Sequence, residues 1–519
     1  MRHLTNLNAL ISVSASVAVA SPSAEQWAER SIYQMMTDRF ARPAGSPDES
    51  CDPYRYCGGS WAGLLTMVEN IADNTVYGEA YHSYWPQNMY ALNEHFGTAD
   101  ELRNLSKELH KRGMYLMVDV VINDMAQAVN SSIDSGSNIN WSRLIPFDDK
   151  KYYHPFCGIE DWNNPDESKN CWFSTEVVAL PDLKTEDESV VSMIQVWVKG
   201  LVGNYSIDGL RVDATEHMNE AYLTSFNEAA GDPDAVCKYE EVVSGLLNYP
   251  LYGPMVQAFT AGNMSGLAEK IRAVHSQCKD FTRLATFTEN HDTPRFASLI
   301  NDTTLAKNAM AFNILSEGIP IVYQGQEQHM KGQYAPYNRE PLWRTSYNRD
   351  GSLYKTTSTL NRLRNNAIRL DKHYVSSHSE ELFLDVSTYA TRKGTEGSQI
   401  VSIFSNQGSQ GGPYNLSIPG AYKPGTEVIE VLGCKRVTAD HEGQIVVKMD
   451  KGEPKAFFSV RKMNGSGLCG FKGRRGKKGA ICPSAGKGNG TRRNDTIEEG
   501  TVEQTSAGNG ASMTVPMIL

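Results

Sequence analysis

Short apolar runs recur along the middle of the chain, and each run ends in polar or charged residues. They cover residues 114–124, 207–213, 284–292 and 319–323 and are rich in Val, Ile and Leu. A helical pattern follows each run, as expected for buried parallel strands that alternate with helices. The polar residues stand at the carboxyl ends of the runs, where the loops of a βα-barrel carry chemistry. The pattern therefore predicts an α/β fold, a (β/α)8 barrel of the TIM type, with a functional site at that end.

Two changes of pattern divide the rest of the chain. Residues 125–186 form a long, aromatic, cysteine-containing excursion of weak periodicity, which indicates a domain inserted into the barrel. Short alternating strands with glycine-rich turns over residues 374–469 predict an antiparallel β-domain. Residues 470–519 are rich in Gly, Ser, Thr and charge, and we expect a disordered tail there. The barrel is then built from residues 21–124 and 187–373.

The N-terminus has the features of a secretory signal peptide over residues 1–20. Arg2 and His3 precede an apolar run, and the run ends in the small-residue sequence Ala18-Val19-Ala20. A buried first helix is the alternative, which the missing helical period disfavours. We therefore expect a secreted, extracellular protein.

The nine cysteines of an exported chain are expected to be mostly paired. Their sequence neighbours suggest the pairs Cys51–Cys57, Cys157–Cys171, Cys237–Cys278 and Cys434–Cys469, which leaves Cys482 over. Spacing alone does not prove this connectivity. A metal site is the weaker alternative, because no histidine interleaves with these cysteines. Asn-X-Ser/Thr sequons, which agree with a glycosylated extracellular protein, occur at Asn130, Asn140, Asn204, Asn263, Asn301 and Asn415.

The formal net charge of −10 is spread along the chain and forms no block. This distribution gives no reason to expect a nucleic-acid partner, and the short basic run at residues 472–478 is more simply part of a solvated tail. No stretch after the N-terminal segment is long enough to span a bilayer, so we expect no transmembrane segment. This charge distribution is consistent with an uncharged binding partner.

Arg211 and Asp213 are the first candidates for chemistry. They stand two residues apart at the end of a predicted strand, so their side chains point to the same face. The guanidinium can hold Asp213 ionised, which suits a nucleophilic carboxylate. A plain ion pair that closes a strand end explains the two residues equally well.

Two further groups of residues have the chemistry to bind a sugar. His291 and Asp292 end another predicted strand and suit hydroxyl groups or a developing positive charge, although alone they could form a polar loop. His82, Tyr84 and Trp85 offer aromatic faces beside an imidazole donor, although aromatic clusters are more often part of a core. None of these segments identifies a function alone, and only their combination is specific enough to do so.

In that combination the chain resembles the fungal α-amylases of glycoside hydrolase family 13, from Gln26 through Cys469. The matching stretches are residues 31–42, 81–85, 113–123, 204–213, 289–296 and 325–329. The resemblance implies endo-acting hydrolysis of α-1,4-glucosidic bonds in starch-like glucans, with retention of configuration and a covalent glycosyl-aspartate intermediate. We also expect a monomer, whose partner is an α-1,4-glucan polysaccharide or a maltooligosaccharide.

The same resemblance assigns roles to the candidate residues. Asp213 is expected to be the nucleophile, Asp292 to stabilise the transition state, and Arg211 to hold the nucleophile. Tyr84 is expected to stack under the bound glucose. The remaining substrate-binding positions are His82, Trp85, His291 and Arg339.

Two departures from the family concern the barrel itself. In the family a strand ending in Gly-Glu-Val carries the general acid, but here Gly231 runs directly into Asp232, so the fifth strand and its glutamate are expected to be missing. Residues 66–74 are too polar for a barrel strand buried on both faces, so the second strand is also expected to be missing. Glu241 is a weak candidate for a replacement acid. We interpret the two gaps as omitted coding sequence.

A third departure concerns the Ca²⁺ site that the resemblance implies. Asn123, Asp182 and His217 match its ligands, but Lys169 stands where an acidic ligand belongs. An ammonium group cannot ligate Ca²⁺ and repels it. We therefore expect a weakened or lost calcium site.

The remaining departures leave the type of activity open. Asp124 replaces a histidine that contacts the glucose, and Ala335 replaces an acidic residue near Arg339. The first change also marks a subgroup that resembles cell-wall α-glucanotransferases, so a transferase and a cell-wall location are alternatives. The C-terminal apolar stretch is too short for a glycolipid-anchor signal. A second alternative is a catalytically impaired α-glucan-binding pseudoenzyme without its acid.

Overall fold

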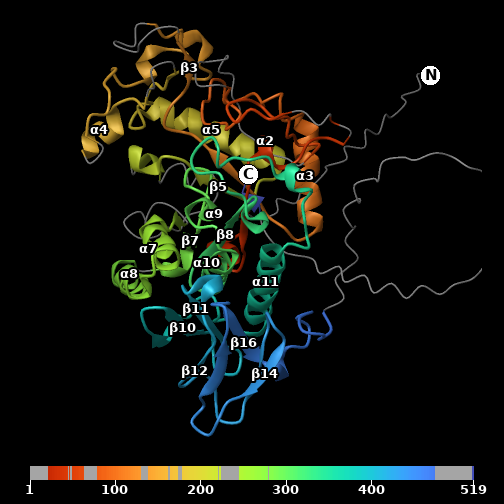
Figure 1. The fold of residues 1–519 in the computed structure, drawn as a ribbon. Helices are drawn as coiled ribbons and strands as arrows, with labels where there is room; N and C mark the ends of the chain where they lie inside the picture. Colours follow the sequence, from red (N-terminus) through yellow and green to blue (C-terminus); the bar gives the residue numbers. More distant parts are fainter. Residues whose placement is uncertain are drawn as a thin grey trace, which may run out of the picture.

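The structure is a computed structural model of the 519-residue chain. It describes residues 22–44, 46, 50–63, 79–129, 138–161, 164–173, 178–219, 221–223, 245–278, 280–473 and 517–518. Figure 1 shows the inserted excursion at one end, the parallel strands in the middle, and the antiparallel sheets of the C-terminal domain at the other end. No helix in these residues is long and apolar enough to cross a membrane.

The central sheet is parallel, as the strand pattern predicts. Its strands are β1 (Ile32–Gln34), β2 (Leu116–Val120), β5 (Gly209–Val212), β6 (Leu246–Leu247), β7 (Leu284–Thr286), β8 (Ile319–Tyr323) and β17 (Met517–Ile518). They lie in the order β5-β2-β17-β1-β8-β7-β6. The register places Asp119 of β2 beside Arg211 of β5. The carboxyl ends of the strands therefore meet at one edge and bring their polar residues together.

The sheet is open between β5 and β6, since no pairing joins these two strands in the described part of the chain. This is where the fifth strand is expected to be missing. The two expected gaps fall in residues 64–78 and 224–244, which lie outside the described residues together with Glu241. The absence of both strands thus stays a prediction.

The expectation of a tail without regular structure needs one correction. β17 lies between β1 and β2, where Met517 stands opposite both Tyr33 and Leu116. The physical reason is that the facing edges of β1 and β2 carry backbone amides and carbonyls that require partners. Two residues satisfy only part of an edge as long as the five-residue β2.

Helices surround the sheet. The longer ones are α3 (Ala99–Lys111), α5 (Glu188–Tyr205), α7 (Tyr249–Thr260), α8 (Met264–Gln277), α10 (Thr303–Leu315) and α11 (Ser352–Leu370); the short ones are α1 (Ala24–Ala28), α2 (Thr37–Phe40) and α9 (Phe296–Leu299). Side chains at the N-termini explain where several begin: Thr98 and Glu101 form a capping box at α3, and Asp302 accepts from two amides of α10. These caps stabilise the first turns of helices that pack on the strands.

The excursion after β2 is small and irregular. β3 (Gln127–Ala128) pairs antiparallel with β4 (Val178–Ala179), and α4 (Pro165–Asn170) lies between them in sequence. The disulfide Cys157–Cys171 closes the segment that contains α4. One disulfide therefore constrains a segment that has little regular structure.

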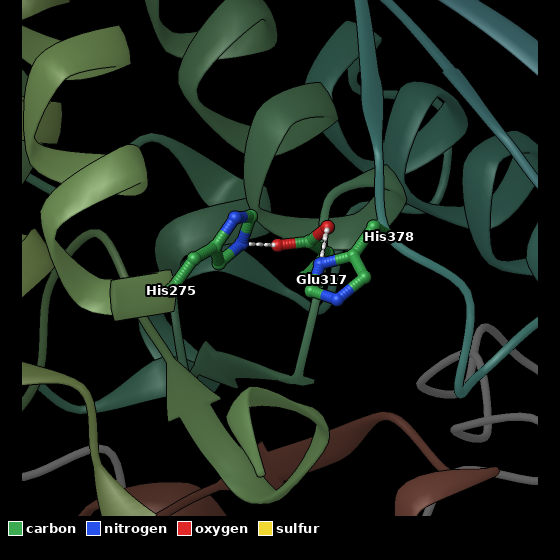
Figure 2. A group of neighbouring side chains, drawn as sticks. All are labelled: His275, Glu317 and His378. Atoms are coloured by element: carbon green, nitrogen blue, oxygen red, sulfur yellow. Dashed lines mark hydrogen bonds and ion pairs between the residues drawn. The ribbon is translucent and has the colours of Figure 1, made fainter. Parts of the chain in front are cut away.

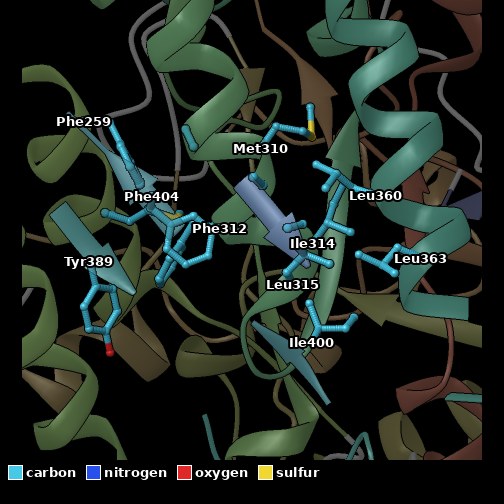
Figure 3. Packing of buried hydrophobic residues seen from close by; sticks show 14 of the residues in the cluster. Phe259, Met310, Phe312, Ile314, Leu315, Leu360, Leu363, Tyr389, Ile400 and Phe404 are labelled. Carbon is cyan, nitrogen blue, oxygen red and sulfur yellow. The ribbon is translucent and has the colours of Figure 1, made fainter. Parts of the chain in front are cut away.

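The C-terminal domain is antiparallel, as predicted. Its strands are β9 (Glu380–Leu384), β10 (Thr388–Lys393), β11 (Ile400–Ser405), β12 (Tyr414–Ile418), β13 (Glu427–Glu430), β14 (Lys435–Thr438), β15 (Ile445–Met449) and β16 (Lys455–Ser459). Six strands form one sheet, and β12 pairs with β15 separately. Figure 3 shows Phe312 of α10 packed beside Phe404 of β11, with ring centroids 5.4 Å apart. One buried hydrophobic cluster thus joins the barrel helices to this domain.

The cysteine pairing is confirmed for the three pairs whose residues are all described, Cys51–Cys57, Cys157–Cys171 and Cys434–Cys469. Cys278 is also disulfide-bonded. Its expected partner Cys237 lies outside the described residues, as does Cys482, which the suggested pairing leaves over.

Candidate active site

A network of charged and polar side chains covers the carboxyl ends of the barrel strands. β1 supplies Gln34, β2 supplies Asp119, β5 supplies Arg211 and is followed by Asp213, and the segment after β7 supplies His291 and Asp292. Tyr84 reaches the same place from the segment that precedes α3. Residues more than 200 positions apart in sequence therefore meet in one site.

Arg211 organises the carboxylates of this network. Its Nη1 donates to Asp119 Oδ2 at 2.6 Å, and its Nη2 lies 2.9 Å from Asp213 Oδ1. Burial disfavours the charged guanidinium, but Asp119, Tyr84 and Asp213 raise the pKa of Arg211 well above its usual value. The expected Arg211–Asp213 ion pair is present, and the Asp213 side chain remains 32% exposed. Asp213 is thus both held and accessible.

Asp119 belongs to the site, although the sequence reasoning did not select it. Its Oδ2 also accepts a 2.8 Å hydrogen bond from the Tyr84 hydroxyl. Burial raises the pKa of Asp119 to about 6, even though Arg211 opposes this shift. A signal existed in the sequence, because a carboxylate inside the apolar run Leu116–Val120 has to be paired if the strand is buried.

His291 is fixed by contacts to both ring nitrogens. Its Nδ1 lies 3.0 Å from the Nε2 amide of Gln34, which is only a donor, so Nδ1 accepts and the proton is assigned to Nε2. Nε2 then faces the Tyr84 hydroxyl at 2.8 Å and Asp292 Oδ2 at 3.0 Å. The rings of Tyr84 and His291 are stacked with centroids 5.4 Å apart. Gln34 is a second residue that the sequence reasoning missed, since nothing marks this amide as distinct from any polar strand end.

Asp292 faces two cationic or polarised partners. Its Oδ1 lies 3.2 Å from Arg339 Nη2, and its Oδ2 faces His291. Partial burial favours the neutral acid, but His291, Arg339 and Arg211 together lower the pKa of Asp292 below its usual value. Its side chain is 45% exposed. An ionised, partly exposed carboxylate therefore lies beside His291 and Arg339.

His82 and Trp85 line the approach to Tyr84. Burial, with the charge of Arg339, lowers the pKa of His82 to about 3, so its ring is neutral. Its Nδ1 accepts from the Tyr84 amide at 3.1 Å, which leaves Nε2 as a donor. Trp85 packs edge-on against His82 at 4.5 Å and contacts the apolar cluster of the excursion. Trp85 thus supports His82, and its predicted contact with substrate stays untested.

The glutamates at the described strand ends are not placed to donate a proton. Glu289 is buried, lies 3.0 Å from Arg295 Nη1 and accepts from the Phe296 amide. Glu327 is also buried and accepts from the Tyr33 hydroxyl. Both carboxylates are thus engaged inside the barrel rather than at the site.

The predicted calcium ligands supply few free oxygen atoms. Asn123 Oδ1 is buried without a hydrogen-bond partner among the described residues and could accept a cation. Asp182 Oδ2 instead lies 2.7 Å from His154 Nδ1, and the ring of His217 bonds to Ser168 on α4. Ca²⁺ requires six to eight oxygen ligands. The three predicted ligands therefore supply fewer oxygen atoms than Ca²⁺ requires, although Asp124 Oδ1 beside Asn123 is also buried without a hydrogen-bond partner among the described residues.

The fold and the site together define a class: βα-barrel proteins with a carboxylate and arginine site at the carboxyl ends of the strands. Comparison with known families sharpens this class. The family described as "Alpha amylase, catalytic domain" matches residues 71–241 and 226–366, and "Alpha-amylase, domain C" matches residues 381–477. The chain belongs to the α-amylase family.

Individual relatives agree with this assignment. The chain is 41% identical to "Alpha-amylase 1" of Schwanniomyces occidentalis over 480 residues, which cover 86% of this chain and 93% of the relative. It is 40% identical to "Alpha-amylase" of Saccharomycopsis fibuligera over 470 residues, 85% of this chain and 93% of the relative. A solved α-amylase structure from Malbranchea cinnamomea superposes with a TM-score of 0.81 at 40% identity, covering 86% of this chain and all of that chain. The resemblance inferred from the sequence is confirmed.

Proposed function

We propose that this chain acts on α-1,4-linked glucans by the retaining mechanism of an α-amylase, with Asp213 as the nucleophile. The observation that carries the proposal is the partly exposed Asp213 carboxylate, which pairs with Arg211 and, together with Asp292, raises the pKa of that guanidinium. Membership of the α-amylase family supports the substrate class.

Each residue of the network has a part in this chemistry. Asp213 attacks the anomeric carbon, and a glycosyl ester forms as the leaving oxygen departs. Asp292 stabilises the positive charge that develops on the sugar ring. Tyr84 presents an aromatic face to the ring and His82 is placed to donate to its hydroxyl groups through Nε2, while His291 Nε2 holds Tyr84 and Asp292. Water then attacks the ester and restores the configuration.

The proton donor for the leaving oxygen remains open. Glu289 and Glu327 are engaged elsewhere, and Glu241 lies outside the described residues. Loss of general acid catalysis reduces rates by about 10²- to 10⁴-fold while leaving the pocket intact. We therefore propose weak hydrolysis of ordinary maltooligosaccharides by this exact chain.

Chemical rescue tests this proposal. A nitrophenyl maltooligoside, whose leaving group needs little protonation, is assayed with and without azide. Azide can capture the glycosyl-enzyme, so increased turnover with an α-glycosyl azide product supports a site that lacks only its acid. Absence of turnover with sugar binding retained would instead support a glucan-binding pseudoenzyme.

The glucanotransferase is the other candidate, and Asp124 favours it. Asp124 is buried and accepts from Asn123 Nδ2 at 3.1 Å, in place of the histidine expected to contact glucose. The same replacement marks the subgroup of the family that resembles cell-wall α-glucanotransferases. Products longer than the donor would assign a transferase, and shorter products alone would assign a hydrolase.

We propose that a tyrosine platform extends the site for further glucose units. We define it by Tyr54, Tyr334 and Tyr337, whose side chains are 40%, 59% and 45% exposed. The ring centroid of Tyr337 lies 6.0 Å from that of Tyr54 and 5.5 Å from that of Tyr334. Tyr337 stands two positions before Arg339, which contacts Asp292. Exposed aromatic faces beside a sugar site suit stacking of pyranose rings.

Export and calcium complete the proposal. Disulfides of the barrel, the excursion and the C-terminal domain support an oxidising, extracellular location. We propose that the protein is a monomer. A cell-wall location stays an alternative. The engagement of Asp182 by His154, and the presence of Lys169, support a weakened or lost calcium site.

A further inference from the structure

Two histidines and a glutamate converge where the barrel meets the C-terminal domain. His275 comes from the last turn of α8, Glu317 from the connection between α10 and β8, and His378 from the segment directly before β9. Figure 2 shows the Glu317 carboxylate between the two imidazole rings, with an interaction drawn to each. None of these residues belongs to the sugar site described above.

The geometry of this cluster brings three ligand atoms together. Glu317 Oε2 pairs with His275 Nε2, while Glu317 Oε1 lies 3.7 Å from His378 Nδ1. One ligand atom from each of the three residues lies within 4.8 Å of the others. The ring of Phe281 packs 5.0 Å from the ring of His275 and 4.1 Å from the ring of His378. Side chains from separate elements are thus held around one point.

The ligand set has the composition of a zinc site. Two imidazoles and a carboxylate bind Zn²⁺ through bonds of about 2.0–2.2 Å, so the ligand atoms around the ion stand about 3.3 Å apart. The required closure is therefore about 1.5 Å at most. His378 can supply this movement because its side chain is 63% exposed, whereas His275 and Glu317 are 23% and 11% exposed. The exposed side also leaves a fourth position for water.

Neighbouring groups act as a second layer around the ligands. The Ser379 amide donates to Glu317 Oε1 and orients the carboxylate. Ser379 Oγ is buried without a hydrogen-bond partner in the described part of the chain and faces the cavity that His275 and Glu317 also line. Lys393 is the opposing charge near Glu317, but burial lowers its pKa to about 8.

We propose that His275, Glu317 and His378 bind a zinc ion that joins the barrel to the C-terminal domain. The nitrogen ligands select Zn²⁺ or a similar transition metal over Ca²⁺, which prefers oxygen ligands. A cation bound only by the native fold stabilises it by RT ln(1 + c/Kd), where c is the concentration of free cation, so the stabilisation rises with the logarithm of c once c exceeds Kd. The bound ion would therefore link the two domains and stabilise the fold in the absence of sugar.

Zinc titration of the full chain tests this proposal. The protein is treated with a chelator, exchanged into buffer at about pH 8, where free imidazoles are neutral, and titrated with ZnCl₂ against a chromophoric chelator. We expect one equivalent to bind, and a melting temperature at least about 2 °C higher with saturating Zn²⁺. CaCl₂ at the same concentration should bind elsewhere or not at all, and should not displace Zn²⁺.

Matched variants separate this site from adventitious binding. His378→Gln and Glu317→Gln should each weaken zinc binding at least tenfold and abolish the thermal shift. His441→Gln is the control, because His441 is 89% exposed on the same domain and lies 3.9 Å from Glu442. His378→Gln alters an exposed side chain, and its metal-free melting temperature verifies folding. Equal binding by all variants, or no binding by the unaltered chain, would overturn the proposal and leave a plain ion-pair cluster. Neither result depends on sugar hydrolysis.

Discussion

At the scale of residues, the Asp119–Arg211–Asp213 network shows what the sequence predicts and what it leaves hidden. The Arg211–Asp213 pair follows from strand alternation, because residues two apart share a face. The strand pattern also places an acid among apolar neighbours at Asp119. Gln34 could not be predicted, since its contact with His291 depends on how β1 lies relative to the segment after β7.

The raised pKa of Asp119 predicts a pH dependence of stability. Because its pKa is about 6 in the fold against 3.8 normally, its contribution is fully present below about pH 4 and is lost as pH rises through 6. Asp119→Asn should remove this part of the pH dependence, worth about 2–3 kcal/mol. Urea unfolding at several pH values between 4 and 7 measures it. Parallel curves for the two proteins would contradict the assignment.

The tyrosine platform predicts that the affinity for a sugar depends on the length of its chain. Tyr334→Ala and Tyr337→Ala should each weaken maltoheptaose binding by about 0.5–1.5 kcal/mol, a factor of about 2 to 13, and leave maltose binding nearly unchanged. Calorimetric titration measures both ligands. Tyr90→Ala is the control, because Tyr90 is 56% exposed but lies outside the platform. Equal losses for both sugars, or for the control, would argue against stacking at this place.

At the scale of elements, the sequence predicts the strands that carry the chemistry better than it predicts the sheet. β2, β5, β7 and β8 all lie within the apolar runs, because buried strands have a strong composition signal. β17 could not be predicted. Its two residues pair only because the edges of β1 and β2 face each other across a gap.

Helix α10 is the element that ties the barrel to the C-terminal domain, and Phe312 is its central contact. Phe312 is 1% exposed and packs between Phe259 and Phe404, with ring centroids at 6.2 and 5.4 Å. Phe312→Ala should destabilise the protein by about 3–5 kcal/mol. Thermal unfolding checks this, with Val446→Ala, a side chain 52% exposed, as the control expected to change stability by less than about 0.5 kcal/mol. A small effect of Phe312→Ala would mean that the two domains unfold independently.

Lys169 on helix α4 leads to a prediction about the effect of calcium on the melting temperature. Calcium chloride at about 1 mM should raise the melting temperature of the unaltered chain little, because Lys169 repels the ion and Asp182 is engaged. Lys169→Glu should restore an oxygen ligand and produce a calcium-dependent shift. Lys151→Glu adds the same charge at an exposed position of the excursion and should not do so. A strong calcium shift in the unaltered chain would show that the site is intact.

At the scale of the whole molecule, the family and the substrate class could be predicted because the strand-end motifs are separate in sequence and converge in the barrel. The C-terminal domain could be predicted from its alternation alone. The proton donor could not be assigned, since Gly231 runs directly into Asp232 where the family sequence continues into the strand that carries the acid. The zinc cluster has no sequence signature, because its ligands are 42 and 61 positions apart and meet only when the two domains pack.

The most direct test of the central claim is turnover of an α-maltooligosyl fluoride. Fluoride departs without a proton donor, so the measurement reports the nucleophile and sugar-binding residues whether or not the general acid is present. We predict fluoride release by the unaltered chain, loss of at least about 10³-fold in Asp213→Asn, and much slower turnover of maltoheptaose. If the unaltered chain releases no more fluoride than Asp213→Asn does, Asp213 is not an active nucleophile and the proposed function is wrong.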